Sequence, residues 1–268
     1  MAQQGFPPTS RPQRDNLARL PELTVTDALP AAIDVVIIGA GNAALCAALS
    51  AAEHGASVLV LEAASEAESG GNSRFTAGAF RVAYDGVEDL RGLMPDLTDD
   101  ECAMTDFGAY PASQFLDDLH RVTEYRTDPM LSETLTSRSY DTLRWMQGLG
   151  VRFNPIWGRQ AYKVDGRFVF WGGLTVEAWG GGPGLVDSLH GLARKAGITI
   201  AFETPMTGLI SDDSGVTGVR VRHQGRSREI AAKAVVLACG GFESNTEWRT
   251  RYLGPGWDLA KVRGTRFN

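Results

Sequence analysis

The sequence predicts an α/β fold in three layers, built on a parallel sheet that carries a β-meander insertion. Short apolar runs at residues 33–38 and 57–61 have the length and composition of strands buried on both faces, and the segment between them is alanine-rich. Strand-like alternation with hairpin turns follows at residues 206–231. A last apolar run at residues 234–238 is expected to complete the parallel sheet.

The leading segment and the first βαβ unit come first along the chain. Residues 1–30 are rich in Pro, Gln, Ser and Arg without an apolar period, which predicts a flexible leader before one domain at residues 31–268. The helix expected at residues 42–54 ends at Gly55, because glycine tolerates a left-handed C-terminal cap. The second strand then leads directly into Glu62.

The middle of the chain is expected to insert helices into this domain, at about residues 97–150. Asp128 followed by Pro129 is a helix-start signal, so the longest helix is predicted at residues 129–147. Residues 151–182 are rich in Trp and Gly and are predicted to be irregular. The remaining elements are predicted as helices at residues 113–126 and 184–196 and strands at residues 198–202, 206–211, 216–223, 227–231 and 234–238.

Composition excludes several classes of function. Of the 268 residues 43% are hydrophobic and 22% charged, and the net charge of -6 gives no basic face for nucleic acid. No apolar run reaches the roughly 18 residues that cross a bilayer, so we expect no direct membrane insertion. Cys46, Cys102 and Cys239 are far apart, which predicts neither disulfides nor a metal site. With no signal-peptide core at the start, we expect a cytoplasmic protein.

The turn after the first strand fits the GxGxxG/A pattern of dinucleotide-binding βαβ units. Gly39 makes the tight turn, Gly41 lets the backbone approach a diphosphate, and Ala44 keeps the helix close to the strand. Free N–H groups at the helix start, near Asn42 and Ala43, are expected to point at the phosphates, where the helix dipole adds to the attraction.

Glu62 strengthens this prediction, because it lies roughly 20 residues beyond the second glycine, where a carboxylate binds a ribose hydroxyl. A carboxylate there would repel a 2′-phosphate, which argues against NADP. The residues that we predict to bind a dinucleotide from this unit are Gly39, Ala40, Gly41, Asn42, Ala43, Ala44 and Glu62.

Three later segments indicate which dinucleotide the chain binds. Residues 69–78 form a loop rich in Gly, Ser and Asn, residues 205–231 carry the meander, and residues 235–242 read VVLACGGF. This succession resembles the flavoproteins of the fumarate reductase and succinate dehydrogenase superfamily, over roughly residues 34–268. The stretches GGNSRFTAGAFR and, at residues 179–184, WGGGPG are most similar to the tricarballylate dehydrogenase group. The resemblance implies a Rossmann-like FAD-binding domain; in a NAD-binding dehydrogenase the meander would have no role.

The resemblance also implies roles for particular residues. The first loop would line the diphosphate and the flavin edge, its last residues would lie against the isoalloxazine, and a main-chain group in the meander would hold the adenine. A turn after the last strand would close over the cofactor, with Cys239 in place of the usual threonine. The implied residues are Gly70, Gly71, Asn72, Ser73, Thr76, Ala77, Gly78, Met206, Ala238, Cys239 and Gly240.

Succinate dehydrogenases bind FAD covalently through a histidine in this first loop. Asn72 occupies that place here, and no histidine lies between His54 and His120, so we expect non-covalent FAD. The implied chemistry is hydride transfer between a small di- or tricarboxylate, such as tricarballylate, and flavin N5. Electrons would leave for an iron–sulfur acceptor protein at the membrane.

The chain stops near the point where this superfamily enters a substrate-capping domain, so we expect a C-terminally truncated sequence. The catalytic residues are then unknown and are expected in the absent part. Three alternatives stay open: a ketosteroid dehydrogenase-like flavoprotein, a precorrin-3B synthase-like flavoprotein, and a non-catalytic FAD-binding fragment. The arginines near loops, which include Arg74 and Arg81, are better interpreted as solvated surface residues, and His120 and His190 as structural ones.

Overall fold

The computed structural model describes residues 29–268, so the predicted leader lies outside the described residues except for its last two positions. A six-stranded sheet contains four parallel strands, β12, β1, β2 and β9, and extends through an antiparallel meander, β10 and β11. This confirms the predicted α/β fold. In sheet order the strands are β10 (Met206–Asp212), β11 (Gly215–His223), β12 (Arg226–Leu237), β1 (Ala32–Ile38), β2 (Val58–Leu61) and β9 (Thr199–Ala201).

Strand β12 corrects one prediction. The two strands expected at residues 227–231 and 234–238 are a single strand, which pairs antiparallel with β11 along its first half and parallel with β1 along its second. Ala231 lies at the exchange, opposite Gly218 on one side and Ala32 on the other. One strand therefore joins the meander to the centre of the parallel sheet.

Each face of the sheet has its own core. Helices α1 (Asn42–Glu53) and α7 (Gly181–Lys195) cover one face, where Ile37 and Val60 are fully buried. On the opposite face the alternate side chains of the same strands pack against the meander residues Val219, Val221 and Ile230. Side chains that alternate along β1 and β2 thus pack into two separate cores, as expected of strands that are buried on both sides.

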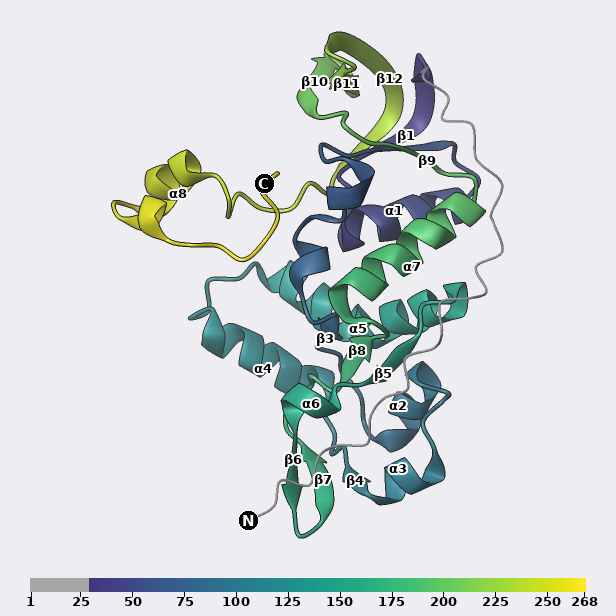
Figure 1. Ribbon diagram of the computed structural model, residues 1–268, viewed down its shortest axis with the longest axis vertical. Helices are drawn as coiled ribbons and strands as arrows, with labels where there is room; N and C mark the ends of the chain where they lie inside the picture. The colour runs from purple at the N-terminus through teal and green to yellow at the C-terminus, as the bar shows by residue number, and fades with distance from the viewer. Residues whose placement is uncertain (1–28) are drawn as a thin grey trace.

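The inserted helices lie toward the other end of an elongated molecule, with α7 running between them and the sheet (Figure 1). Asp128 caps the longest of these helices by accepting the Leu131 N–H at 3.0 Å. The helices are α2 (Val87–Leu93), α3 (Asp99–Ala103), α4 (Ala112–Val122), α5 (Pro129–Leu149) and α6 (Trp157–Gln160). None of the helices in residues 29–268 combines the length and apolarity needed to span a bilayer.

Residues 151–182, predicted to be irregular, contain strands instead. Asp165 and Gly166 both have positive φ, +48° and +85°, and they turn a hairpin between β6 and β7. This is the Asp-Gly turn that matches the twist of a hairpin. Two small sheets result, in the orders β3 (Ala79–Phe80), β8 (Val176–Ala178), β5 (Phe153–Pro155) and β4 (Thr105–Asp106), β7 (Arg167–Phe170), β6 (Ala161–Val164).

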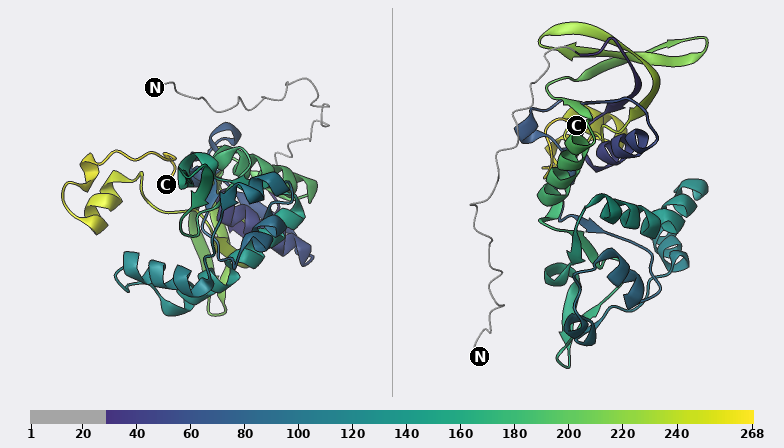
Figure 2. Two further views of the ribbon diagram at one scale, coloured as in Figure 1. Left: turned by 90° about the horizontal axis from the view of Figure 1, so that it is seen from below. Right: turned by 90° about the vertical axis from the view of Figure 1, so that its right-hand side faces the viewer.

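The chain ends in a segment that projects from the body, here called the C-terminal arm (residues 242–268). It contains α8 (Thr246–Leu253) and the short 3-10 turn η3 (Trp257–Leu259), and Figures 1 and 2 show it standing to one side of the molecule. Two further 3-10 turns, η1 (Glu66–Glu68) and η2 (Gly71–Phe75), follow β2 and lie beside α7.

Candidate functional site

The turn after β1 is formed by a glycine that no other residue could replace without strain. Gly39 has a φ of +104°, in the left-handed region, and its N–H donates to the carbonyl of Leu61 at 2.7 Å. A Cβ at this position would lie 2.6 Å from the carbonyl oxygen of Ala238. Gly39 therefore lets the ends of β1, β2 and β12 meet at one point.

The N-terminal end of α1 opens beside this turn. Gly41 is the N-cap residue and provides no side-chain cap, and a Cβ on it would fill the gap to Gly70 O and Ser73 Oγ, 3.4 Å from each. The Asn42 N–H donates to Ser73 Oγ at 3.0 Å, whereas Ala43 is exposed. The Asn42 N–H, which the sequence predicts to be free, is therefore taken by Ser73. The helix end still carries the positive pole of its dipole, the kind of site that binds phosphate.

Glu62 lies immediately beneath the same turn and is only 7% exposed. One carboxylate oxygen accepts the Ala40 N–H and the other accepts the Ala64 N–H, both at 2.8 Å. The carboxylate thus fixes the conformation of the turn, a contact that the sequence did not predict. Each oxygen keeps lone-pair capacity for a further donor, such as a ribose hydroxyl.

The first part of the glycine-rich loop lies against α7. Gly70 is buried and has a φ of +102°, and a Cβ on it would lie 2.6 Å from Cγ1 of Val186. The contact of Gly41 with Gly70 and Ser73 brings this part of the loop to the start of α1. Gly71 also has a positive φ, of +55°, but no atom would contact its Cβ.

The second part of the loop meets the start of α7. Gly182 N–H donates to the Thr76 carbonyl at 3.2 Å, and a Cβ on Gly78 would lie 2.5 Å from the carbonyl carbon of Gly181. A Cβ on Gly181 would in turn lie 3.2 Å from the Ala77 carbonyl oxygen. The glycines at the start of α7 are therefore needed so that the loop and the helix can touch through their backbones.

Asn72 is the residue of this loop that contacts the C-terminal arm. Its side-chain oxygen accepts the Thr265 N–H at 3.0 Å, and its amide nitrogen donates to Glu243 at 3.2 Å. After β12 the chain turns through Cys239 and Gly240, which are exposed, and Ala238 N–H donates to the Ile38 carbonyl at 3.0 Å. The exposed turn after β12 thus adjoins the turn after β1.

Met206 lies on the meander side of the site. The segment before it is tied to Glu62, because the Thr204 N–H donates to the Glu62 carbonyl at 2.8 Å. Met206 itself pairs with Val221 and is partly buried on the meander face of the sheet. Among the described residues, its strand partner is Val221, and it is Thr204, two residues earlier, that contacts Glu62.

Two titratable groups lie close to the helix start, and burial keeps both of them neutral near pH 7. Burial raises the pKa of Cys46, on α1, to about 11, and its Sγ contacts the Asn42 side-chain oxygen at 3.6 Å. Burial lowers the pKa of His190 on α7, an effect partly opposed by a hydrogen bond with the backbone of Ala40. Neither group therefore places a charge beneath the turn.

Taken together, these contacts bring three predicted segments to the carboxyl ends of β1, β2 and β12. Backbone donors at an uncapped helix end, gaps that a Cβ would fill and a buried carboxylate fit the diphosphate and ribose of a dinucleotide. Two contacts in this region are not predicted by the sequence, that of Arg74 with the Ser69 carbonyl and that of Glu62 with the Ala64 N–H. Both involve a backbone group, which every residue type carries, so no sequence pattern indicates them.

The fold and the site define a dinucleotide-binding flavoprotein domain, and comparison with known proteins gives its family. The family described as FAD binding domain matches residues 34–260. The chain belongs to that family, within the fumarate reductase and succinate dehydrogenase type of flavoproteins. FAD is therefore its cofactor.

Relatives agree with this assignment. The chain is 29% identical over 225 residues to the fumarate reductase (cytochrome) of Shewanella frigidimarina, covering 83% of this chain and 35% of that protein. It is 28% identical to the urocanate reductase of Eggerthella lenta, over 87% of this chain and 34% of that protein. The open conformation of a flavocytochrome c3 fumarate reductase superposes with a TM-score of 0.63 at 26% identity, over 83% of this chain and 36% of that one. The chain thus spans about a third of these relatives' length.

Proposed function

We propose that this chain is the cofactor-binding part of a FAD-dependent oxidoreductase that acts on a small di- or tricarboxylate. The observation that carries the proposal is the meeting of the Gly39 turn, Glu62 and the Gly70 loop around the open end of α1. The chemistry that FAD supplies when bound is transfer of a hydride at flavin N5. The residues of this chain bind and orient the cofactor for that transfer.

Particular residues have particular tasks in this proposal. The N–H groups at the start of α1 bind the diphosphate, and Glu62 accepts a ribose hydroxyl while it holds the Ala40 N–H. Thr76, Ala77 and Gly78 lie along the flavin ring, and the main chain at Met206 holds the adenine. Cys239 and Gly240 close over the cofactor from the end of β12.

The carboxylate substrate is supported by the relatives' names and by the resemblance in two segments. Fumarate and urocanate, named for two relatives, are both unsaturated carboxylates. Tricarballylate remains our specific proposal, with an iron–sulfur protein at the membrane as electron acceptor. A cytoplasmic location is part of the same proposal and is supported by the three free cysteines in the described chain.

Non-covalent attachment is the first point to test. The purified chain is loaded with FAD, freed of unbound flavin by gel filtration and precipitated with acid. We expect one flavin per chain before precipitation and all of the flavin in the supernatant afterwards, because Asn72 cannot form the covalent link that a histidine forms. Flavin that stays in the pellet would contradict non-covalent binding, and a colourless protein would contradict FAD binding itself.

The substrate requires the full-length gene product. Under anaerobic conditions, tricarballylate is expected to bleach the visible absorption of the bound flavin as the flavin is reduced, and a ketosteroid is expected to leave it unchanged. Bleaching by the steroid alone would support the ketosteroid dehydrogenase alternative. Bleaching by neither compound would overturn tricarballylate, and fumarate and urocanate would then be assayed as oxidants of the pre-reduced flavin.

A further inference from the structure

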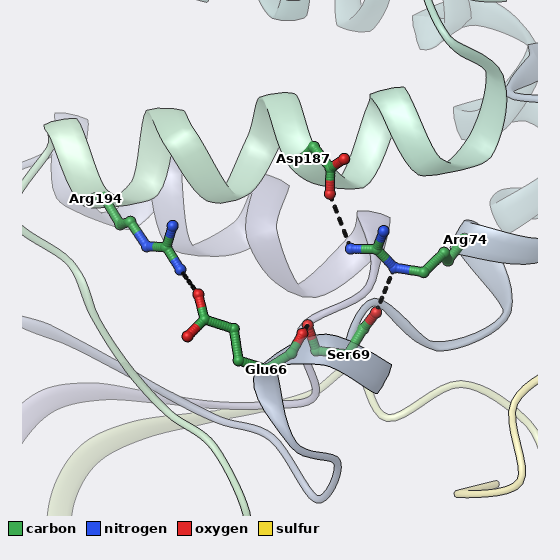
Figure 3. A network of polar contacts seen from close by, with 5 residues as sticks. All are labelled: Glu66, Ser69, Arg74, Asp187 and Arg194. Atoms are coloured by element: carbon green, nitrogen blue, oxygen red, sulfur yellow. Dashed lines mark hydrogen bonds and ion pairs between the residues drawn. The ribbon is translucent and has the colours of Figure 1, made fainter. Parts of the chain in front are cut away.

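Arg74 is held between the loop that carries it and helix α7. Its Nε donates to the carbonyl of Ser69 at 2.7 Å, and its terminal nitrogen pairs with the carboxylate of Asp187 at 2.9 Å (Figure 3). The Arg74 side chain is 24% exposed, and Ser69 is fully buried. The guanidinium is thus committed to two partners and is not a free surface charge.

Arg74 and its partner Ser69 lie at opposite ends of the same short turn, and its other partner, Asp187, lies on α7. Ser69 immediately precedes the buried Gly70, and Arg74 immediately follows Ser73, so the Nε contact closes residues 69–74 into a ring. Asp187 follows Val186, the residue on which Gly70 packs. The ion pair therefore fastens the loop to α7 next to the contact of Gly70 with Val186.

This closed turn presents the two groups that meet the start of α1. Ser73 Oγ accepts the Asn42 N–H at 3.0 Å, and the carbonyl of Gly70 lies across the gap at Gly41. If the ring opened, Gly70 could leave its left-handed conformation, with a φ of +102°, and both groups would move away from the helix end. A second ion pair, between Glu66 and Arg194, joins the preceding turn η1 to α7 (Figure 3), and its side chains are 45% and 61% exposed for Arg194 and Glu66.

We propose that Arg74 is a positioning residue for FAD, which holds residues 70–73 in the conformation that receives the cofactor at the start of α1. The inference rests on FAD binding by this chain and adds a residue that the dinucleotide pattern does not include. Exposed ion pairs contribute little, about 0–1 kcal/mol. The effect of Arg74 is therefore expected to come mainly from its charge-assisted bond to the Ser69 carbonyl.

The test compares the dissociation constant for FAD, from quenching of flavin fluorescence, among matched variants. Arg74→Met is expected to weaken FAD binding about tenfold or more, the scale of one lost charge-assisted hydrogen bond. Asp187→Asn keeps the Arg74–Ser69 contact and is expected to weaken FAD binding only by roughly threefold. Arg74→Lys, which can satisfy one partner at a time, is expected to lie between them.

Two measurements separate positioning from general stability. The thermal midpoint of the apoprotein is expected to fall by roughly 3–10 °C in Arg74→Met, the scale of one lost charge-assisted hydrogen bond, and the variant is expected to stay folded at the temperature of the FAD titration. The control is Arg220→Met, which removes the exposed arginine paired with Glu229 on the meander and is expected to keep wild-type FAD affinity.

Wild-type affinity in Arg74→Met would overturn the inference, as would an equal loss in the Arg220→Met control. If Arg74→Met does not fold, unchanged affinity in both Arg74→Lys and Asp187→Asn would overturn it instead. Failure of the wild-type chain to bind FAD would be seen before any variant is made, and it would reject the cofactor rather than the role of Arg74 alone.

Discussion

At the scale of single residues, the site depends on backbone conformations that only glycine adopts readily. Gly39 combines a left-handed φ with a carbonyl oxygen 2.6 Å from where a Cβ would lie. Gly55, after the end of α1, has a φ of +81° but nothing within 4 Å of its Cβ position. A side chain at Gly39 would therefore cause both backbone strain and a clash, whereas a side chain at Gly55 would cause backbone strain alone.

Replacement of Gly39 by Ala is expected to lower the free energy of unfolding by about 3 kcal/mol or more, because strain and clash add. The same change at Gly55 is expected to cost about 1 kcal/mol, since only the backbone is strained. Urea denaturation of the two apoproteins measures both values. Equal losses would show that the contact between Gly39 and the end of β12 is not as tight as described.

His190 makes stability depend on pH. Its side chain is 5% exposed, Nε2 has no hydrogen-bond partner in the described structure, and Arg74, Arg194 and Asp187 are its charged neighbours. Because burial lowers its pKa in the folded state, the unfolded chain binds the proton first as pH falls. The contribution of His190 is therefore fully present above the unfolded pKa of about 6.5 and is lost as pH falls below it.

His190→Leu is expected to flatten the fall in unfolding free energy between pH 7 and pH 5, by at most about 1.4 kcal/mol per pH unit for one proton. Urea denaturation across this range measures the slope. Phe202→Leu is the control, because it alters the ring 6.0 Å from His190 without removing a titratable group, and it should keep the wild-type slope. An unchanged slope in His190→Leu would show that this histidine binds protons equally in the folded and unfolded states, so that folding does not lower its pKa.

At this scale the sequence predicted what a spacing can encode. Gly39, Gly41 and Glu62 follow a pattern because each has a fixed place around a diphosphate. Arg74 was interpreted as a surface residue, and the structure gives it a buried backbone partner instead. Every residue type has a carbonyl oxygen, so the sequence cannot indicate that Arg74 contacts the one at Ser69.

At the scale of elements, local signals predicted helices better than strands. The start of α5 was predicted from Asp128 and Pro129, and both act as expected in the structure. The hairpin at Asp165 and Gly166 was missed although its turn signal is strong, because the surrounding tryptophans and glycines favoured an irregular interpretation. Strand β12 was divided in two because a change of pairing partner within one strand depends on residues far away in the chain.

The α5 cap offers a test that should leave the cofactor untouched. Asp128→Ala is expected to lower the free energy of unfolding by about 1 kcal/mol, because the Leu131 N–H loses its acceptor. Asp128→Asn, which keeps a side-chain oxygen, is expected to cost less than half of that. Urea denaturation and FAD titration are measured together. A loss of FAD affinity in Asp128→Ala would mean that the inserted helices and the site are coupled.

At the scale of the whole molecule, the sheet lies at one end and the inserted helices toward the other (Figure 1). In the proposed function the Gly39 turn and Glu62 would bind the diphosphate and the ribose, so most of the contacts described here would address the adenylate half of FAD. Met206, where the adenine is proposed to bind, follows two residues after Thr204, whose N–H donates to the Glu62 carbonyl.

FAD at about 100 times its dissociation constant is expected to stabilise the chain by about 2.7 kcal/mol, and so to raise the thermal midpoint by several degrees. FMN, which lacks the adenylate half, is expected to give less than half of this shift at the same concentration. Differential scanning fluorimetry with an extrinsic dye compares the two ligands. Equal shifts with the two ligands would show that the main binding contacts are made to the flavin half and not at the turn after β1.

The pairing of β12 with β1 also determines when this site can exist during synthesis. Ile38 lies opposite Leu237, so the two central strands come from opposite ends of the described chain. A ribosome adds about 5–20 residues per second, and contacts between distant segments form late and slowly. The turn at Gly39 therefore waits, without its neighbour Ala238, for about 10–40 s while the residues between them are translated. We therefore expect flavin to bind only after β12 has been synthesised, because the edge of β1 that pairs with β12 stays open until then.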